Sequence, residues 1–167
     1  FGEYYSNPGS SNAPSFGELL LTREDEMIDF NWGGGSPDPL IPNDDYQVRW
    51  TGNIFAETTG QYDFRTYTDD GLRLYIEDIP VIDHWSDQGP TSRYGSIQLD
   101  QGQHELIMEY YENGGGAVSH LYWTPPGSPE SLVLPIDSGW LFIEDYGSTI
   151  FPFQSSEIEF IVITDNL

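Results

Sequence analysis

The 167-residue sequence contains no cysteine and no lysine, and only five of its residues are basic. Without cysteine, disulfides, thiolate nucleophiles and thiolate metal sites are excluded. Without lysine, Schiff-base catalysis and phosphate binding by a P-loop are excluded as well. No run of 18 apolar residues marks a membrane-spanning helix. The chemistry open to this chain is that of carboxylates, amides, hydroxyls, imidazoles, aromatic rings and backbone groups.

Negative charge dominates what remains. The chain has 28 acidic residues against five arginines, which gives a net charge of −23 at pH 7. A surface of this sign repels phosphate backbones and anionic lipid headgroups, and it concentrates cations. The arginines are scattered along the sequence, so neighbours form no basic groove. We therefore expect no nucleic-acid partner and no membrane insertion.

Turn residues punctuate the chain. The 18 glycines and 12 prolines separate short segments that are rich in aromatic and β-branched residues. This cadence is typical of an all-β antiparallel sandwich or barrel. One short helix, Thr22–Ile28, is predicted from a threonine that precedes several acids. The predicted strands are Tyr46–Phe55, Gln61–Thr68, Leu72–Glu77, Tyr94–Leu99, Glu105–Glu112, Ser119–Trp123, Trp140–Glu144 and Ile158–Thr164.

The most informative segment is a pair of predicted strands that meet at Asp69-Asp70-Gly71. Apolar and polar residues alternate on both sides of this step, and an Asp-Gly pair between such runs predicts a hairpin with an exposed tip. A second turn, Asn113–Ala117, is glycine-rich and separates a strand from its expected return strand.

The residues alone leave two interpretations of the aspartate pair open. In the first, Asp70-Gly71 only supplies the positive φ angles of a type I′ turn. In the second, Asp69, Asp70, Asn113 and backbone carbonyls form part of a cage for a hard cation such as Ca²⁺, which prefers oxygen ligands. Other adjacent acids, such as Asp44-Asp45 and Glu77-Asp78, are about as frequent as chance predicts for so acidic a chain.

Five blocks of sequence favour the second interpretation of the aspartate pair, the cation cage. They are GQYDF, TYTDDGLRLYIEDIPVIDHW, HELIMEYYENGGGAVSHLYW, the stretch Ile28–Gly33 and QVRWTGNIF at 47–55. Together, and in the order in which they follow one another along the chain, they closely resemble the PA14 domain family over roughly Gly2–Leu134. The resemblance implies a β-sandwich module of the kind found in secreted glycosidases, toxins and adhesins.

The resemblance also implies a ligand site. In lectin-type members, two adjacent aspartates joined by a cis peptide hold a calcium ion that coordinates sugar hydroxyls, and these match Asp69 and Asp70. A second loop matches Asn113–Val118, so Asn113 and Gly116 are the further expected metal ligands. Asn113, Gly114 and Gly115 are expected to shape the sugar pocket. The implied function is a secreted or cell-surface, calcium-dependent carbohydrate-binding module.

Other residues give no clear sign of a further binding or catalytic site. Trp85 is expected either to stack on a sugar ring beside the site or to pack as core. The three histidines show no zinc-ligand spacing, and no nucleophile elbow or separated acid pair points to hydrolysis. We therefore expect a module that binds without catalysing a reaction.

The C-terminal part suggests an alternative function. Residues 1–138 are assigned to the PA14-type sandwich, and residues 139–167 to a strand extension that packs on the same domain or on a neighbouring subunit. The strand-like segment 157–167 could add to an open sheet edge of another copy. The alternative is therefore a structural subunit of an extracellular filament or surface assembly.

Overall fold

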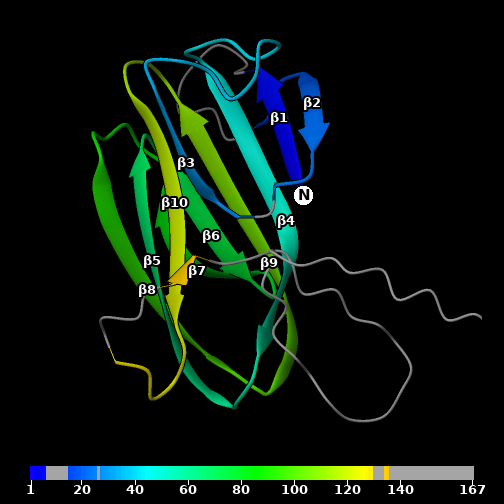
Figure 1. Cartoon of the computed structure of the whole chain (residues 1–167), viewed down its shortest axis with the longest axis vertical. Coiled ribbons are helices and arrows are strands. Elements are labelled where there is room, and N and C mark those ends of the chain that lie inside the picture. The colour runs from blue at the N-terminus through cyan, green and yellow to red at the C-terminus, as the bar shows by residue number, and fades with distance from the viewer. Residues whose placement is uncertain (7–14, 26, 130–133, 136–167) are drawn as a thin grey trace, which may run out of the picture.

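The structure, a computed structural model, describes residues 1–6, 15–25, 27–129 and 134–135 (Figure 1). These residues form strands and connecting loops, with no helix among them. The strands are β1 (Gly2–Ser6), β2 (Leu19–Arg23), β3 (Asp29–Gly33), β4 (Tyr46–Ala56), β5 (Gly60–Asp69), β6 (Leu72–Ile76), β7 (Ile79–His84), β8 (Thr91–Leu99), β9 (Gly102–Glu112), β10 (Ala117–Thr124) and β11 (Leu134–Pro135).

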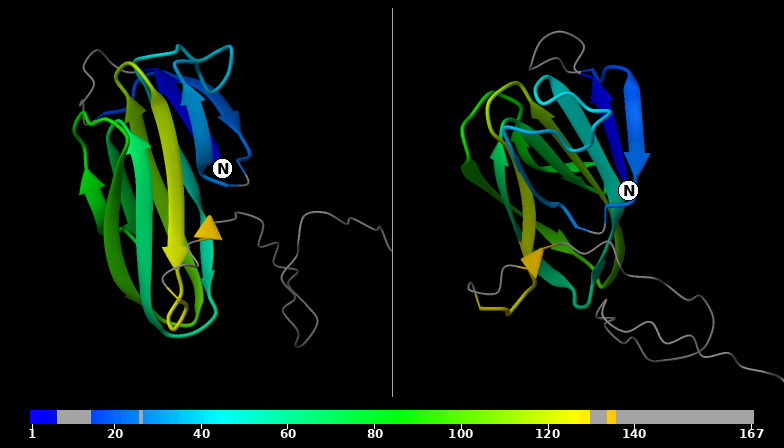
Figure 2. Two further views of the ribbon diagram at one scale, coloured as in Figure 1. Left: turned by 60° about the vertical axis from the view of Figure 1, so that its left-hand side comes forward. Right: turned by 45° about the horizontal axis from the view of Figure 1, so that its top comes forward.

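Two antiparallel sheets face each other and enclose the core (Figure 2). One sheet has six strands in the order β2-β1-β4-β9-β6-β7, and the other has five strands including β3, with the order β11-β10-β5-β8 and β3 paired to β10. The all-β sandwich predicted from the sequence is therefore confirmed.

Alternation along the strands builds the core. On β5, Tyr62 and Phe64 are buried while Asp63 between them is exposed. On β6, Leu72, Leu74 and Ile76 are fully buried and the residues between them face outward. Successive strand residues point to opposite faces of a sheet, so each inner face presents a largely apolar layer.

Six predicted strands are confirmed within about three residues at each end, and they correspond to β4, β5, β6, β8, β9 and β10. Strands β1, β2, β3, β7 and β11 were not predicted, because each is short or interrupted by polar residues. The predicted helix Thr22–Ile28 is wrong. Its first residues complete β2, which pairs with β1, and this tertiary pairing overrides the capping signal.

The predicted hairpin at Asp69-Asp70-Gly71 is also wrong. Strand β5 pairs with β8 and β10, whereas β6 pairs with β7 and β9 in the other sheet. The type I′ hairpin turn lies one strand later, at Glu77 and Asp78, whose φ angles are 51° and 62°. The aspartate pair is instead a crossover between sheets, and Asp70 is only 5% exposed rather than at an exposed tip.

The glycine-rich turn after β9 is a crossover too, since β10 belongs to the five-stranded sheet and is not the return strand of β9. Four crossovers meet at one end of the sandwich, at the top of Figure 1: residues 34–45, 70–71, 85–90 and 113–116. The register requires this, because Asp69 pairs with Val118, Leu72 with Tyr110, and Tyr46 with Glu112. Crossovers far apart in sequence therefore share one site.

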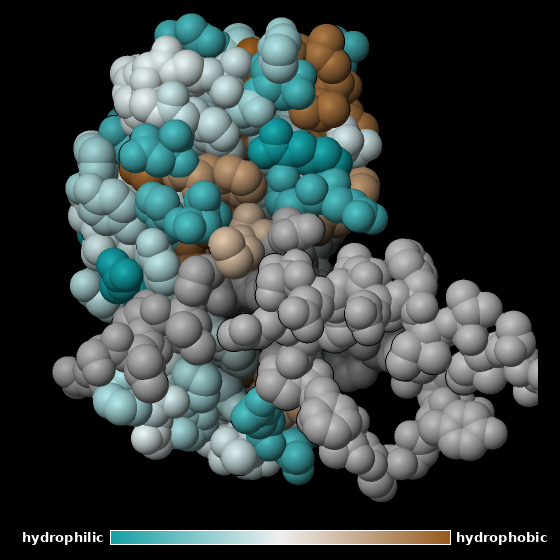
Figure 3. Space-filling view, viewed as in Figure 1, coloured by the Kyte–Doolittle hydropathy of each residue, from teal (hydrophilic) through white to brown (hydrophobic). Residues whose placement is uncertain are grey.

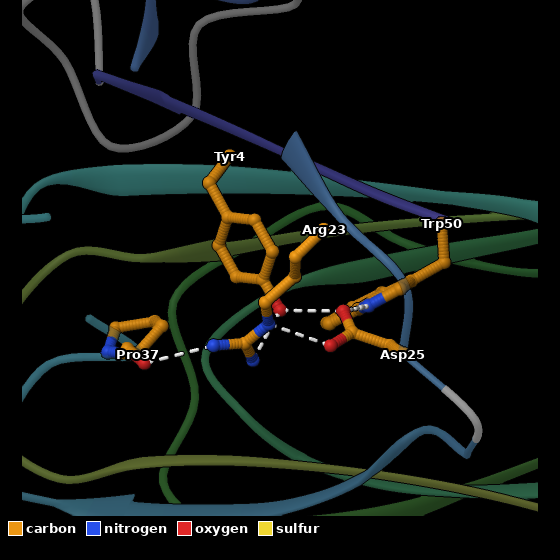
Figure 4. A network of polar contacts seen from close by, with 5 residues as sticks. All are labelled: Tyr4, Arg23, Asp25, Pro37 and Trp50. Carbon is orange, nitrogen blue, oxygen red and sulfur yellow. Dashed lines mark hydrogen bonds and ion pairs between the residues drawn. The ribbon is translucent and has the colours of Figure 1, made fainter. Parts of the chain in front are cut away.

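A polar network fastens β1 and β2 to the sandwich (Figure 4). The Asp25 carboxylate accepts hydrogen bonds from the Tyr4 hydroxyl (2.6 Å), the Trp50 indole (2.8 Å) and Arg23 Nε (2.6 Å). Arg23 also donates to the Pro37 carbonyl at 2.9 Å, so the 34–45 crossover is tied to the same network. The Asp25 side chain is only 4% exposed, so its charge is balanced inside the protein.

Some predictions lie outside the described residues. These are the strands Trp140–Glu144 and Ile158–Thr164, the extension 139–167 and pairing through 157–167. In the part of the chain that the structure describes, there is no helix long and apolar enough to cross a membrane.

Removal of the central acid of the Figure 4 network should destabilise the domain. In the Asp25→Ala variant, Arg23 loses its counter-charge and the Tyr4 and Trp50 donors lose their acceptor, which costs on the order of 3 kcal/mol and lowers the thermal midpoint by roughly 10 °C. Thermal unfolding followed by circular dichroism measures the effect. The neighbouring exposed acid provides the control, since Glu24→Ala should leave the midpoint within about 2 °C. Equal midpoints for the two variants would contradict the structural role of the network.

Candidate metal centre

Three carboxylates meet at the crossover end of the sandwich. Oxygen atoms of Asp69, Asp70 and Glu112 all lie within 4.8 Å of one another. Asp69 ends β5, Asp70 follows it in the crossover, and Glu112 ends β9. The peptide bond between Asp69 and Asp70 is cis, which confirms the expectation from the family resemblance.

Backbone donors fix the orientation of Asp70. Its Oδ1 accepts the backbone N–H of Gln88 at 3.0 Å, and its Oδ2 accepts the backbone N–H of Asn113 at 2.9 Å. These donors come from the 85–90 and 113–116 crossovers, so one carboxylate ties three crossovers together. Gly71, the next residue, leaves room for the Tyr111 ring, because a Cβ at position 71 would lie 2.2 Å from that ring.

Glu112 is fully buried, and one of its oxygens lacks a partner. Its Oε1 makes no hydrogen bond within the described part of the chain. Its Oε2 lies 3.1 Å from the Tyr110 hydroxyl, which also contacts the Asp69 carbonyl oxygen. A hydroxyl carries one hydrogen, so when Tyr110 donates to the carbonyl, a protonated Glu112 can donate to Tyr110.

The pKa values in the cluster agree with this arrangement. Burial raises the pKa of Glu112 to about 8, and the charges of Asp70, Asp69 and Asp44 add to the effect of burial. Burial and the charge of Asp70 also raise the pKa of Asp69. Both groups therefore resist ionisation until a positive charge balances them.

A hard divalent cation fits this donor set. Such ions take carboxylate, carbonyl and water oxygens, and three carboxylates with an unpartnered buried oxygen supply several. Among the described residues, no arginine or histidine forms an ion pair with any of the three acids. The absence of thiolate or imidazole groups from the cluster favours calcium or magnesium over zinc.

The glycine-rich crossover lies against the cluster as predicted, although its residues play different parts. A Cβ on Gly116 would lie 3.7 Å from Asp69 Oδ2, so this residue sits beside the acids. Asn113 uses its backbone N–H for Asp70, and its side-chain amide donates to Asp87 at 3.2 Å. Its role as a side-chain metal ligand remains a prediction, as does that of Gly116.

The predicted sugar-contacting residues form the rim of the cluster. Gly114 and Gly115 are exposed beside it, and the Gly115 N–H donates to Asp44 Oδ1 at 3.1 Å. Gly115 has a φ of 108°, a conformation that glycine adopts readily. Asp44 therefore holds the crossover in shape, a role that its position before a strand did not reveal.

Trp85 is half-buried at the same end of the sandwich. Its ring packs edge-on against Tyr111, with 4.8 Å between centroids, and the Arg73 guanidinium lies 4.4 Å from its centroid. The ring therefore packs partly against the fold, and part of it stays at the surface. Stacking of Trp85 on a sugar remains a prediction.

Sequence reasoning missed Glu112 and Gln88. Glu112 directly precedes the predicted loop residue Asn113, but its inward orientation depends on pairing with Tyr46 on β4. Gln88 donates its side-chain amide to Thr68 Oγ1 at 3.0 Å and to the Asp70 carbonyl at 3.1 Å. No local pattern marks either residue.

The three histidines lie outside this cluster and have other polar neighbours. His84 Nε2 lies 2.9 Å from the Ser86 hydroxyl, His104 Nδ1 lies 3.2 Å from Glu77, and His120 pairs with Asp29. Each therefore has a polar neighbour that accounts for its position.

Comparison with known proteins assigns the chain to a family. The family model for the PA14 domain matches residues 1–137. The chain belongs to the PA14 domain family. The PA14 domain studied here is 36% identical over 133 residues to anti-sigma-I factor RsgI3 of Acetivibrio thermocellus, a match that covers 79% of this chain and 20% of RsgI3.

Solved structures agree with this assignment. An anti-sigma factor domain-containing protein is 34% identical, with a TM-score of 0.73, over 88% of this chain and 49% of that protein. A PA14 sugar-binding domain from an RTX adhesin shares the fold, with a TM-score of 0.66 and 22% identity over 82% of this chain and 93% of that domain. The chain thus spans about a fifth of the curated relative and about half of the first of these structures.

The raised pKa of Glu112 predicts how stability depends on pH without metal. A carboxyl whose pKa rises from 4.5 to about 8 on folding stabilises the native state below pH 4.5, and this contribution is lost as pH rises through 8. In EGTA, the thermal midpoint should therefore fall by several degrees between pH 5 and pH 8. Glu112→Gln should flatten this slope, whereas Glu105→Gln, at an exposed position on the same strand, should retain it. Identical slopes for wild type and Glu112→Gln would contradict the burial of an ionisable Glu112.

Proposed function

We propose that this PA14 domain is a calcium-dependent carbohydrate-binding module. The observation that carries the proposal is the meeting of Asp69, Asp70 and Glu112 within 4.8 Å, with a buried Glu112 oxygen that has no partner in the described structure. Calcium held there would supply a positive charge with coordination positions for sugar hydroxyls. Asn113 and Gly116 are the further ligands that the family resemblance implies.

The chain's own residues would orient and restrict the ligand. Gln88 and Asn113 hold the Asp70 carboxylate in place, and Tyr110 links Glu112 to the Asp69 carbonyl. The exposed Gly114 and Gly115 leave the approach to the cluster free of side chains, so a bulky saccharide can come close. Trp85 would offer an apolar ring at the rim.

Names of structural relatives support a carbohydrate ligand. One neighbour is described as a sugar-binding PA14 domain of an adhesin, and another is an epithelial adhesin domain from Candida glabrata in complex with Galβ1-3GlcNAc. By analogy we place this domain outside the cell or at the cell surface. We propose binding without catalysis, although a glycosidase also contains this fold.

A second candidate is the input domain of a transcriptional regulator. The relatives with 36% and 34% identity are an anti-sigma factor and an anti-sigma factor domain-containing protein. As an input domain, the module would bind a polysaccharide to signal its presence to the regulator instead of attaching a cell to it. The filament subunit remains a third proposal, and it depends on residues 157–167.

A glycan array probed in calcium and again in EGTA tests the proposed function. We expect binding to a defined set of glycans in calcium and its loss in EGTA, with recovery when calcium is restored. Binding that is unaffected by EGTA would contradict the metal-dependent mechanism, and the absence of any bound glycan in calcium would contradict the carbohydrate function.

Loss of one proposed ligand should weaken the metal site without unfolding the protein. Asp69→Asn removes one carboxylate charge and should weaken calcium binding at least about 100-fold in calorimetric titration, since a direct ligand matters more than its supporting partners. Asp78→Asn is the matched control, because Asp78 lies in the exposed β6–β7 turn at a φ of 62°, which asparagine tolerates. We expect the control to bind calcium like the wild type. Equal affinities for both variants would place the calcium elsewhere.

A further inference from the structure

The outer face of the five-stranded sheet carries a second group of aromatic residues. Register pairs Tyr94 on β8 with Arg65 on β5, and Arg65 with Tyr122 on β10. These residues form one row across the sheet. The next row contains Tyr67 on β5 and its partner His120 on β10. All are outward positions, since they alternate with buried residues such as Phe64 and Leu121.

The planar groups of these rows contact one another. The Arg65 guanidinium carbon lies 4.2 Å from the centroid of the Tyr122 ring. His120 stacks on Tyr122 with 6.0 Å between centroids and 22° between planes, and it lies 5.9 Å from Tyr67. Tyr94 is 73% exposed at the side of the same surface. We call this surface the outer aromatic face, made by Arg65, Tyr67, Tyr94, His120 and Tyr122.

The side chains between these rings are polar. On β5, β8 and β10, the other outward positions of these two rows and of the row that contains Asp63 hold hydroxyl or carboxylate groups, at Asp63, Ser92, Ser96 and Thr124. Aliphatic side chains are absent from these nine positions. The mixture of flat rings and hydrogen-bonding groups matches a carbohydrate, which presents apolar C–H faces and hydroxyls to a binding site.

The outer aromatic face is continuous with the acid cluster along β5. Asp63, Arg65, Tyr67 and Asp69 are alternate residues of this strand, so each lies about 7 Å from the next. The path from Asp63 to Asp69 is therefore about 20 Å long. Such a path would hold several sugar units in a row.

Charge narrows the choice of carbohydrate. Arg65 is the one basic residue in these rows apart from His120, and each has an acidic neighbour, Asp63 or Asp29. The chain as a whole carries a charge of −23, which disfavours an anionic polymer away from the metal. Hydropathy points the same way. The visible part of this side of the molecule is largely hydrophilic (teal and pale), and its largest hydrophobic (brown) patch lies away from β5 and β8 (Figure 3).

We infer that the outer aromatic face extends the calcium site and binds consecutive units of a neutral, linear polysaccharide. The inference rests on the proposed function, since one unit would sit at the acid cluster and the others would lie along β5. It adds that the ligand is an extended chain, so affinity grows with chain length until the face is filled.

Oligosaccharides of two lengths test this inference. Calorimetric titrations in calcium would use the disaccharide and the hexasaccharide of β-1,4-xylan, β-1,4-glucan and β-1,4-mannan. For at least one backbone, the wild type should bind the hexasaccharide at least about tenfold more tightly than the disaccharide. Tyr94→Ala should lose this gain while keeping its affinity for calcium and for the disaccharide. Because Tyr94 is 73% exposed, the variant should remain folded.

Tyr75→Ala is the matched control, since Tyr75 lies on the outer face of the opposite sheet, and it should bind like the wild type. Equal hexasaccharide affinities for wild type and Tyr94→Ala would overturn the inference, as would a wild type that binds none of the six probes. Tyr94→Ala could lose hexasaccharide affinity while the wild type binds the hexasaccharide equally well in calcium and in EGTA. That result would support binding at the outer aromatic face and contradict the calcium mechanism. The two claims therefore fail separately.

Discussion

Repulsion among three partly or fully buried carboxylates is the constraint on which the functional end of this domain depends. Asp69, Asp70 and Glu112 are brought within 4.8 Å of one another, and two of them have raised pKa values because of burial and mutual charge. An arrangement of this kind needs protons or a cation to balance it. In the proposed calcium site, the cation balances the three acids. Without metal, we expect Glu112 to be protonated instead.

The sandwich produces this crowding through its connections. Strands β5 and β9 end at the same end of the sandwich. After each of them the chain crosses to the opposite sheet instead of forming a hairpin. Crossovers from four parts of the sequence therefore converge, and backbone donors from Gln88 and Asn113 hold the central aspartate. At the side of the domain, the Asp25 network shows the other way to bury an acid, with its counter-charge and donors built in.

Local sequence patterns predicted the core well, because alternation is a property of each strand alone. Tyr62, Phe64, Leu72 and Leu74 are apolar members of the alternating runs beside the Asp-Gly step, and all four are buried. Strand partners depend on distant residues, so the Asp-Gly step was misread as a hairpin although the true turn, at Glu77 and Asp78, is one strand away. Glu112 was missed for the same cause, since only its pairing with β4 turns it inward. The local pattern marked the aspartate pair but left its role open, and the choice of a cation site and the cis bond came from the family resemblance.

The most direct test of the account is a crystal structure of the protein grown in millimolar calcium, with an anomalous difference map to locate the ion. We predict a peak with oxygens of Asp69 and Asp70 about 2.3 to 2.6 Å away. A map in which this acid cluster holds no ion while the metal is present in the crystal would contradict it.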